Sequence, residues 1–200
     1  MRAGIQQTIG FAGLLSQEIQ KGNDILKGMI VCGYPGVGKS SIAGWHNCID
    51  LESSNFSHCP WVLDDTNYFW EEHYVQVAED LAKQGYTVLL STHPGVIENV
   101  KKIDKIPVVI FCPKVEMKAQ WYERLKKRYI KTCTEKDYRA WTGAMKSMVT
   151  FESQIENLLS YDLPVIQPES IDYDLKNYMF LAWYKYGEWS VEKENKNEQD

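Results

Sequence analysis

One glycine-rich segment has the residue types and spacing of a phosphate-binding site: Gly33-Tyr34-Pro35-Gly36-Val37-Gly38-Lys39-Ser40, with Ser41 next. Glycines at these intervals let successive backbone N–H groups turn inward around phosphate oxygens, and a helix that follows offers the positive end of its dipole. Lys39 would then reach the β- and γ-phosphates, and the Ser40 hydroxyl would hold Mg²⁺. The pattern predicts that residues 33–41 bind ATP with magnesium.

Such a loop needs a strand that leads into it and a helix that follows it. The apolar run Ile25–Cys32 is typical of a short buried strand that ends at Gly33, and Lys39–Trp45 is typical of the following helix. The alternative is a glycine-rich turn without a ligand, which would not require these neighbours. The context therefore favours a phosphate-binding loop.

Further strands and helices must position the loop. Apolar runs predict strands at Cys48–Leu51, Tyr86–Ser91, Ile106–Phe111 and Pro164–Ile166, with a partial strand at Trp61–Leu63. Helices are predicted through Tyr74–Leu81 (capped by Asp64, Asp65 or Thr66), from Pro94, from Pro113 toward Ile130, over 135–159 and over Tyr173–Tyr184. This alternation predicts an α/β three-layer sandwich, the P-loop NTPase fold, with a central parallel sheet of about five strands. Ligands of such sheets bind at the carboxyl ends of the strands.

The chain of 200 residues is expected to form one main domain. We place that domain at residues 25–190, after an amphipathic helix within residues 1–24 that packs on it and before a disordered polar tail at 191–200. The net charge of −5 gives no electrostatic reason to expect broad binding to nucleic acid.

A cytoplasmic location follows from three further absences in the sequence. No apolar run approaches the roughly 18 residues that cross a bilayer, and the opening Met1–Gly4 lacks a secretory signal core. The 5 cysteines are odd in number and form no C-x-x-C pair, which favours reduced thiols over a disulfide framework. We therefore expect no membrane partner.

Two classes of phosphate-loop protein conflict with the remaining residues. A GTPase would read guanine with Asn-Lys-x-Asp after a strand, and residues 25–190 contain no such motif. A AAA-type or helicase-type ATPase would need an apolar strand that ends in Asp-Glu, whereas Tyr86–Leu90 is followed by Ser91-Thr92-His93.

The chain instead resembles the nucleoside-monophosphate-kinase-like group of phosphate-loop kinases, which includes adenylate, thymidylate, shikimate and gluconate kinases. Gly33-x-Pro35-Gly36-x-Gly38-Lys39 looks like the adenylate-kinase form of the loop, with Ser40-Ser41 where many relatives carry Gly-Thr or Ser-Thr. The resemblance extends over roughly residues 28–185 as an order of elements, but only the loop is a specific motif. It implies transfer of a phosphoryl group from ATP.

In that family an acidic pair at the end of the second strand faces the phosphate acceptor, and Asp50-Leu51-Glu52 occupies the matching place. A carboxylate there can accept the hydrogen of an attacking hydroxyl or hold a water in the magnesium shell. Asp50 is thus a candidate catalytic residue, with Glu52 as the alternative. A plain turn-capping role for either residue stays open.

A basic helix at residues 120–129 is similar to the helix that bears the lid in these kinases, within a lid-like region around 114–140. Arg124, Lys127 and Arg128 stand at i, i+3 and i+4 and so share one helix face. The resemblance implies that Arg124 and Arg128 stabilise the transferring group. A solvated basic face is the alternative, and Arg139 is a weaker lid candidate.

Several other residues allow more than one interpretation. The aromatic residues Phe56, Trp61, Tyr68, Phe69 and Trp70 would contact a nucleobase acceptor or form a small core. A zinc site from His46, Cys48, His58 and Cys59 matches no common spacing. His93 would touch phosphate or acceptor, or serve a structural role.

We therefore expect an ATP- and Mg²⁺-dependent kinase that phosphorylates a small acceptor, preferably a nucleoside or nucleotide. The first alternative is an ATP-binding or ATPase module that regulates or assembles a protein partner. The second is a polynucleotide kinase, which Lys126, Lys127, Arg128 and Lys131 would favour if they lined one groove. The acceptor, the choice between ATP and GTP, and the oligomeric state are left open.

Overall fold

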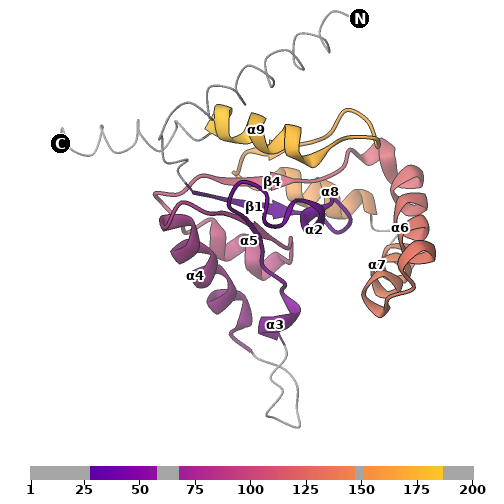
Figure 1. The fold of residues 1–200 in the computed structure, drawn as a ribbon, viewed down its shortest axis with the longest axis horizontal. Coiled ribbons are helices and arrows are strands. Elements are labelled where there is room, and N and C mark those ends of the chain that lie inside the picture. Colours follow the sequence, from indigo (N-terminus) through magenta and orange to yellow (C-terminus); the bar gives the residue numbers. More distant parts are fainter. Residues whose placement is uncertain (1–27, 58–67, 147–150, 187–200) are drawn as a thin grey trace, which may run out of the picture.

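The computed structural model describes residues 28–57, 68–146 and 151–186, and a parallel sheet lies at its centre (Figure 1). The strands are β1 (Met29–Gly33), β2 (Cys48–Asp50), β3 (Thr87–Leu90), β4 (Val108–Phe111) and β5 (Val165–Ile166). Their order in the 5-stranded sheet is β2-β3-β1-β4-β5, and every neighbouring pair is parallel. The predicted parallel sheet is confirmed.

The central strands are largely apolar because both of their faces are covered. Every residue of β1, β3 and β4 is buried, as expected for parallel strands between layers of helices. Ile30 of β1 pairs with Val88 on one side and Val108 on the other. This register brings the carboxyl ends of β1, β3 and β4 to the same edge of the sheet.

Helices cover the sheet on both faces. They are α2 (Lys39–Ile42), α3 (Ser54–Ser57), α4 (Trp70–Lys83), α5 (Pro94–Val100), α6 (Lys118–Thr132), α7 (Glu135–Lys146), α8 (Phe151–Ser160) and α9 (Leu175–Tyr186). In Figure 1, α9 lies along one face, α4 and α5 lie along the opposite face, and α6 and α7 stand together at one end. The indole N–H of Trp183 in α9 donates to the Thr87 hydroxyl of β3 over 2.8 Å, which ties that helix to the sheet.

Helix α2 is shorter than predicted. It ends at Ile42 instead of Trp45, because Ala43 turns to an extended backbone and Gly44 takes a φ of +80°. The following His46 and Asn47 also have positive φ, and the N–H of Gly44 donates to the carbonyl of Cys48 over 2.7 Å. This turn reverses the chain directly into β2.

The predicted helix from Pro113 begins later, with a 3₁₀ turn at Val115–Met117 that leads into α6. That helix ends where Cys133 takes a left-handed backbone with φ of 51°. Within the region predicted as helical at 135–159, α7 and α8 flank residues 147–150, which lie outside the described part of the chain. Four other predictions also lie outside it: the helix at 1–24, the partial strand Trp61–Leu63, the caps Asp64–Thr66 and the tail at 191–200.

Candidate functional site

The glycine-rich loop connects β1 to α2 at the carboxyl edge of the sheet. Gly36 and Gly38 have φ values of +88° and +101°, a backbone that side chains with a Cβ rarely adopt. A Cβ on Gly36 would also lie 2.7 Å from Cδ2 of Leu125 in α6. The loop shape therefore depends on these two glycines, and α6 packs tightly against it.

Lys39 lies beneath this loop. Its ammonium donates to the Gly33 carbonyl over 2.8 Å, at the start of the loop. Burial lowers its pKa, while the negative charges of Asp50 and Glu52 act in the opposite direction. Lys39 is half-buried, and its cation is held close to where backbone N–H groups would receive phosphate.

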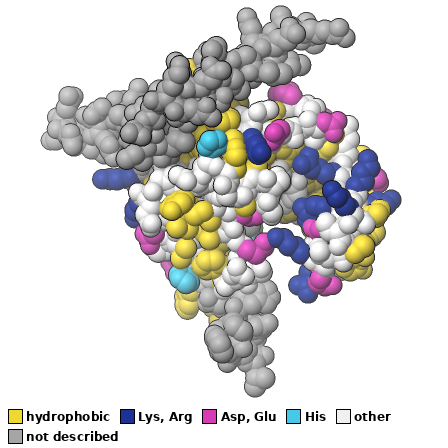
Figure 2. All heavy atoms as spheres, viewed as in Figure 1, with side chains coloured by type: hydrophobic (Ala, Val, Ile, Leu, Met, Phe, Trp, Pro, Cys, Tyr) yellow, Lys and Arg dark blue, Asp and Glu magenta, His cyan; other side chains and the backbone are white. Residues whose placement is uncertain are grey.

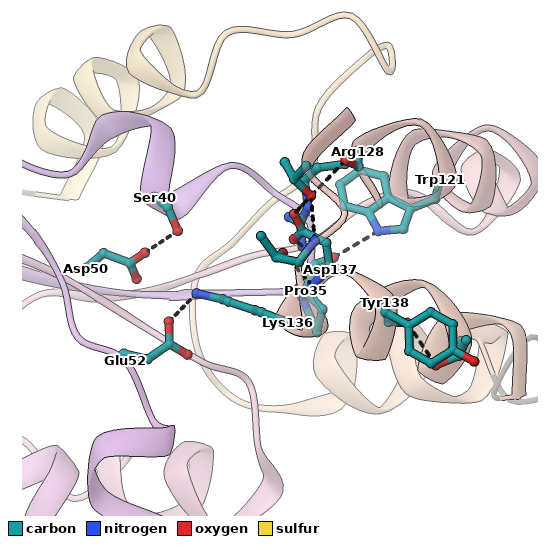
Figure 3. A network of polar contacts seen from close by, with 12 residues as sticks. Pro35, Ser40, Asp50, Glu52, Trp121, Arg128, Lys136, Asp137 and Tyr138 are labelled. Carbon is teal, nitrogen blue, oxygen red and sulfur yellow. Dashed lines mark hydrogen bonds and ion pairs between the residues drawn. The ribbon is translucent and has the colours of Figure 1, made fainter. Parts of the chain in front are cut away.

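Asp50 and Ser40 meet at the first turn of α2. The Ser40 hydroxyl donates to Oδ2 of Asp50 over 2.7 Å, and Figure 3 shows the two side chains pointing toward each other. They come together because Asp50 pairs with Leu89 of β3, which sets the end of β2 at the same sheet edge as the loop. A hydroxyl and a carboxylate are oxygen ligands of the kind that Mg²⁺ prefers. Ser41, in contrast, donates back to the Gly38 carbonyl over 2.6 Å and supports the loop itself.

A cavity of about 320 Å³ opens above this pair, with charged side chains on its wall. Arg128 of α6 lines it and forms an ion pair of 2.6 Å with Asp137. Lys136 of α7 also lines it and pairs with Glu52, so a bridge crosses from α7 to the segment after β2 (Figure 3). We call this space the loop cavity. Lys136 was not among the predicted site residues, since no motif surrounds it and only the tertiary fold brings α7 to Glu52.

Arg124 occupies a different environment from Arg128. Its guanidinium lies over the rings of Tyr173 and Trp121, 4.8 and 5.5 Å from their centroids, and donates to the Ile171 carbonyl over 2.8 Å. It lines a separate surface cavity together with Lys127 rather than the loop cavity. It is nevertheless close to the loop, since a Cβ on Gly38 would lie 3.9 Å from its Nη2.

The other basic residues of the lid-like region face elsewhere. Arg139 is exposed and pairs with Glu135 of its own helix over 2.9 Å. Lys126 is turned to Glu123, 3.9 Å away, while Lys127 lines the cavity of Arg124. Figure 2 shows Lys and Arg side chains gathered over α6 and α7, with Arg128 at the loop cavity and Lys127 at the cavity of Arg124.

Three distant side chains hold the loop in place. The Trp121 indole donates to the Pro35 carbonyl over 2.9 Å, and the Tyr173 hydroxyl donates to the Val37 carbonyl over 2.8 Å. The hydroxyl of Tyr34 donates to Oε1 of Gln154 in α8 over 2.7 Å. These contacts were not predicted, because nothing local in the sequence links Trp121 or Tyr173 with a loop more than eighty positions earlier.

Two of the aromatic residues predicted near the acceptor pack internally. Phe56 contacts His73 and Tyr74, and Trp70 contacts Tyr74 and His93. Tyr68 and Phe69 are exposed, while Trp61 lies outside the described residues. The small-core interpretation thus describes Phe56 and Trp70, and the nucleobase interpretation stays a prediction for the exposed pair.

The cysteines of the sheet are buried thiols. Burial raises the pKa of Cys32 and Cys112 to about 12 and that of Cys48 to about 11, so all three are protonated at neutral pH. In the described segments, no group of three metal-ligating side chains converges. His58 and Cys59, the other half of the zinc alternative, lie outside those segments.

Comparison with known proteins does not place the chain in a family. No family model matches the sequence, and no curated protein is significantly similar to it. In the part of the chain that the structure describes, none of the helices combines the length and the apolar character needed to cross a bilayer.

Proposed function

We propose that the protein is a cytoplasmic phosphotransferase that moves the γ-phosphoryl group of ATP to a small acceptor. The observation that carries this proposal is the 2.7 Å contact between Ser40 and Asp50 beside the loop that holds Lys39. A glycine-rich turn without a ligand would not require a carboxylate at the hydroxyl of Ser40. The arrangement of β1, loop and α2 supports the P-loop NTPase fold on the same grounds.

The residues present fit a magnesium–triphosphate. The positive φ of Gly36 and Gly38 lets the loop backbone curve as a phosphate-binding loop requires, and the Ser40 hydroxyl and Asp50 carboxylate form an oxygen donor set. The buried Nε of Arg128 has no hydrogen-bond partner among the described residues, and Arg128 lines the loop cavity. An unsatisfied buried donor is costly, and its presence here suits a polar ligand.

Each side chain then has a distinct task. The backbone N–H groups of the loop and Lys39 would hold the phosphates, while Ser40 would hold the metal directly and Asp50 either directly or through water. Asp50 would orient the acceptor hydroxyl and accept its proton. Arg128 and Lys136 would oppose the negative charge of the transferring group from the far wall of the cavity. When bound, Mg²⁺–ATP supplies the phosphoryl group and neutralises part of its charge.

The test is ADP release from Mg²⁺–ATP across a panel of nucleosides, nucleoside monophosphates, sugars, small hydroxy acids and oligonucleotides. The Lys39→Ala variant serves as the blank, with circular dichroism to show that it is folded. We expect one acceptor class to stimulate ADP release by the natural protein and none to stimulate the variant. Equal turnover by the two proteins would refute the assignment of the loop.

A second function, an ATPase module that serves a protein partner, is favoured by one observation. The described residues that follow β3, Ser91-Thr92-His93, contain no carboxylate. In that case ADP release would be slow and indifferent to every acceptor of the panel, and it would change only when a protein partner is added. An oligonucleotide that stimulates release would instead identify a polynucleotide kinase.

A further inference from the structure

A second cavity lies directly beside the loop cavity. Its volume is also about 320 Å³, and its walls come from the loop, the start of α5 and the helix α8. The two cavities share the residues Pro35, Ser91 and His93, so they meet at the end of β3. We call this space the α8 cavity. Its volume lies in the range of small-molecule sites.

The lining of the α8 cavity is uncharged and mainly apolar, with a few polar groups among its residues. Besides the shared residues, the described side chains that line it are Tyr34, Thr92, Pro94, Gln154, Asn157 and Leu158, with no Lys, Arg, Asp or Glu among them. This contrasts with the loop cavity, which Lys39, Asp50, Glu52, Arg128 and Lys136 line.

The two titratable groups of the α8 cavity are both neutral near pH 7. Burial raises the pKa of the Tyr34 phenol to about 12. Burial also lowers the pKa of His93, and the charge of nearby Glu71 opposes that shift without reversing it. The cavity therefore offers amides, hydroxyls and a neutral imidazole but no counter-charge for an anion.

This difference in charge separates two kinds of ligand. A phosphate that enters a cavity without a cation loses its hydration and gains no ion pair, which is unfavourable. The hydroxyls and ring nitrogens of an uncharged compound, in contrast, would find hydrogen-bond partners in the amides of Gln154 and Asn157 and in the Thr92 hydroxyl.

We infer that the α8 cavity binds the phosphate acceptor, and that this acceptor is an uncharged hydroxyl compound, a nucleoside or a sugar, rather than a nucleoside monophosphate. The inference rests on the proposed kinase function and narrows its acceptor. Ser91 lies at the junction of the two cavities, where its hydroxyl lies beside the Tyr74 phenol and could also contact a polar group of the acceptor.

In the proposed reaction, one bond to the γ-phosphorus forms as another breaks, and residues of the two cavities bind both reactants. The acceptor hydroxyl oxygen forms a bond to the γ-phosphorus, and the bond from that phosphorus to the bridging oxygen breaks. ADP leaves with the electron pair, and the hydroxyl proton passes to the Asp50 carboxylate, which lines the loop cavity. His93 lines both cavities and contacts the Trp70 ring.

The experiment compares matched acceptors with the full chain and Mg²⁺–ATP: nucleosides against their 5′-monophosphates, and sugars against sugar phosphates. We expect only the uncharged member of a pair to stimulate ADP release, and mass spectrometry of the product distinguishes a nucleoside from a sugar. Stimulation by the phosphorylated member alone would overturn the inference and leave the kinase function standing. If no acceptor changed the rate of ADP release, both the inference about the acceptor and the proposed kinase function would be refuted.

Variants of α8 locate the acceptor. Asn157→Ala should raise the KM for the acceptor about tenfold and leave the KM for ATP unchanged, since it removes one hydrogen-bonding group of a neutral site. Glu156→Ala is the matched control, because Glu156 is an exposed neighbour on α8 that lines neither cavity. Asn157→Lys should shift the preference toward the monophosphate by at least about tenfold relative to Asn157→Ala. Equal acceptor KM values for the Asn157→Ala and Glu156→Ala variants would place the acceptor elsewhere and overturn the inference.

Discussion

The helix α6 carries two arginines one turn apart that meet different surroundings. Arg128 faces the loop cavity, where its partner is the carboxylate of Asp137. Arg124 lies behind the loop, over two aromatic rings and against a backbone carbonyl. The first environment is part of the charged lining of the loop cavity, which we call the charged wall. The second is formed by Trp121, Tyr173 and Ile171, and we call it the aromatic cage.

Position on a helix face therefore does not decide the role of a basic side chain. The i, i+4 spacing of Arg124 and Arg128 predicts a shared face, yet the chain that returns after β5 covers Arg124 and leaves Arg128 at the cavity. We therefore expect the charged wall to affect turnover and the aromatic cage to affect stability. Four substitutions test this distinction, and we begin with the one that should change turnover most.

The largest effect is expected from Asp50→Asn in the charged wall. The amide cannot accept the acceptor proton, so kcat should fall by about 10²- to 10⁴-fold while ATP still binds through the loop. Steady-state kinetics and calorimetric titration with a non-hydrolysable ATP analogue measure the two quantities. Glu52→Gln is the matched control and should reduce kcat far less. A parallel loss of turnover and ATP binding in Asp50→Asn would show that this residue is structural.

Arg128→Ala should reduce kcat by roughly a hundredfold or more, since it removes a cation that in the proposed function would face the transferring group. The measurement belongs in an Asp137→Asn background, which avoids leaving the Asp137 carboxylate without its partner. Lys126→Ala on the same helix is the control, because Lys126 is turned to Glu123. Unchanged kcat in the Arg128 variant would remove this residue from the charged wall.

Arg124→Ala should act mainly on stability. It removes the contacts with two rings and the hydrogen bond to Ile171, a loss of about 1–3 kcal/mol in the free energy of unfolding. Urea denaturation measures this loss, and the exposed Arg139→Ala should change the same quantity by no more than about 0.5 kcal/mol. If Arg124→Ala instead lowered kcat as much as Arg128→Ala and left stability intact, the distinction between the two arginines would fail.

The smallest effect concerns Asp137 and acid pH. Burial acts to raise its pKa, but hydrogen bonds from Thr132 and Thr134 and the charge of Arg128 outweigh this and lower it. A lowered native pKa gives stability that is present above the ordinary value of 3.8 and is lost as pH falls through the native pKa. Asp137→Asn should therefore show a shallower fall in Tm between about pH 5 and about pH 2 than the natural protein. Asp104→Asn, at an exposed site, should retain the full acid dependence. An identical profile for Asp137→Asn would contradict the lowered pKa of Asp137.

The sheet could be predicted because its information is local. Each central strand is a short apolar run, and the loop motif marks where β1 ends, so the strands were placed within a few residues of their observed bounds. The end of α2 could not be predicted, since nothing between Ile42 and Trp45 forbids a helix except Gly44. Trp45 lies beyond the end of the helix and stacks on Trp183, a residue far along the chain.

The site was predictable only where a motif or a strand end marks it. Lys39, Ser40 and Asp50 lie together as the loop and the carboxyl edge of the sheet require. Lys136, the aromatic cage and the α8 cavity depend on how α7, α8 and the segment before α9 return to the loop. Those contacts arise from tertiary packing, for which a single sequence gives no periodic signal.

The three side chains that hold the loop have a consequence for the order of folding. Tyr34, Pro35 and Val37 are fixed by partners 120, 86 and 136 residues away in the chain. Contacts between such distant residues require large chain segments to be ordered first, so they form late. The motif is synthesised before Tyr173, but its final shape has to await that residue. A nascent chain that ends before Tyr173 would contain the complete motif without its full support, so the proposed nucleotide binding should tighten only after Tyr173 has packed on the loop.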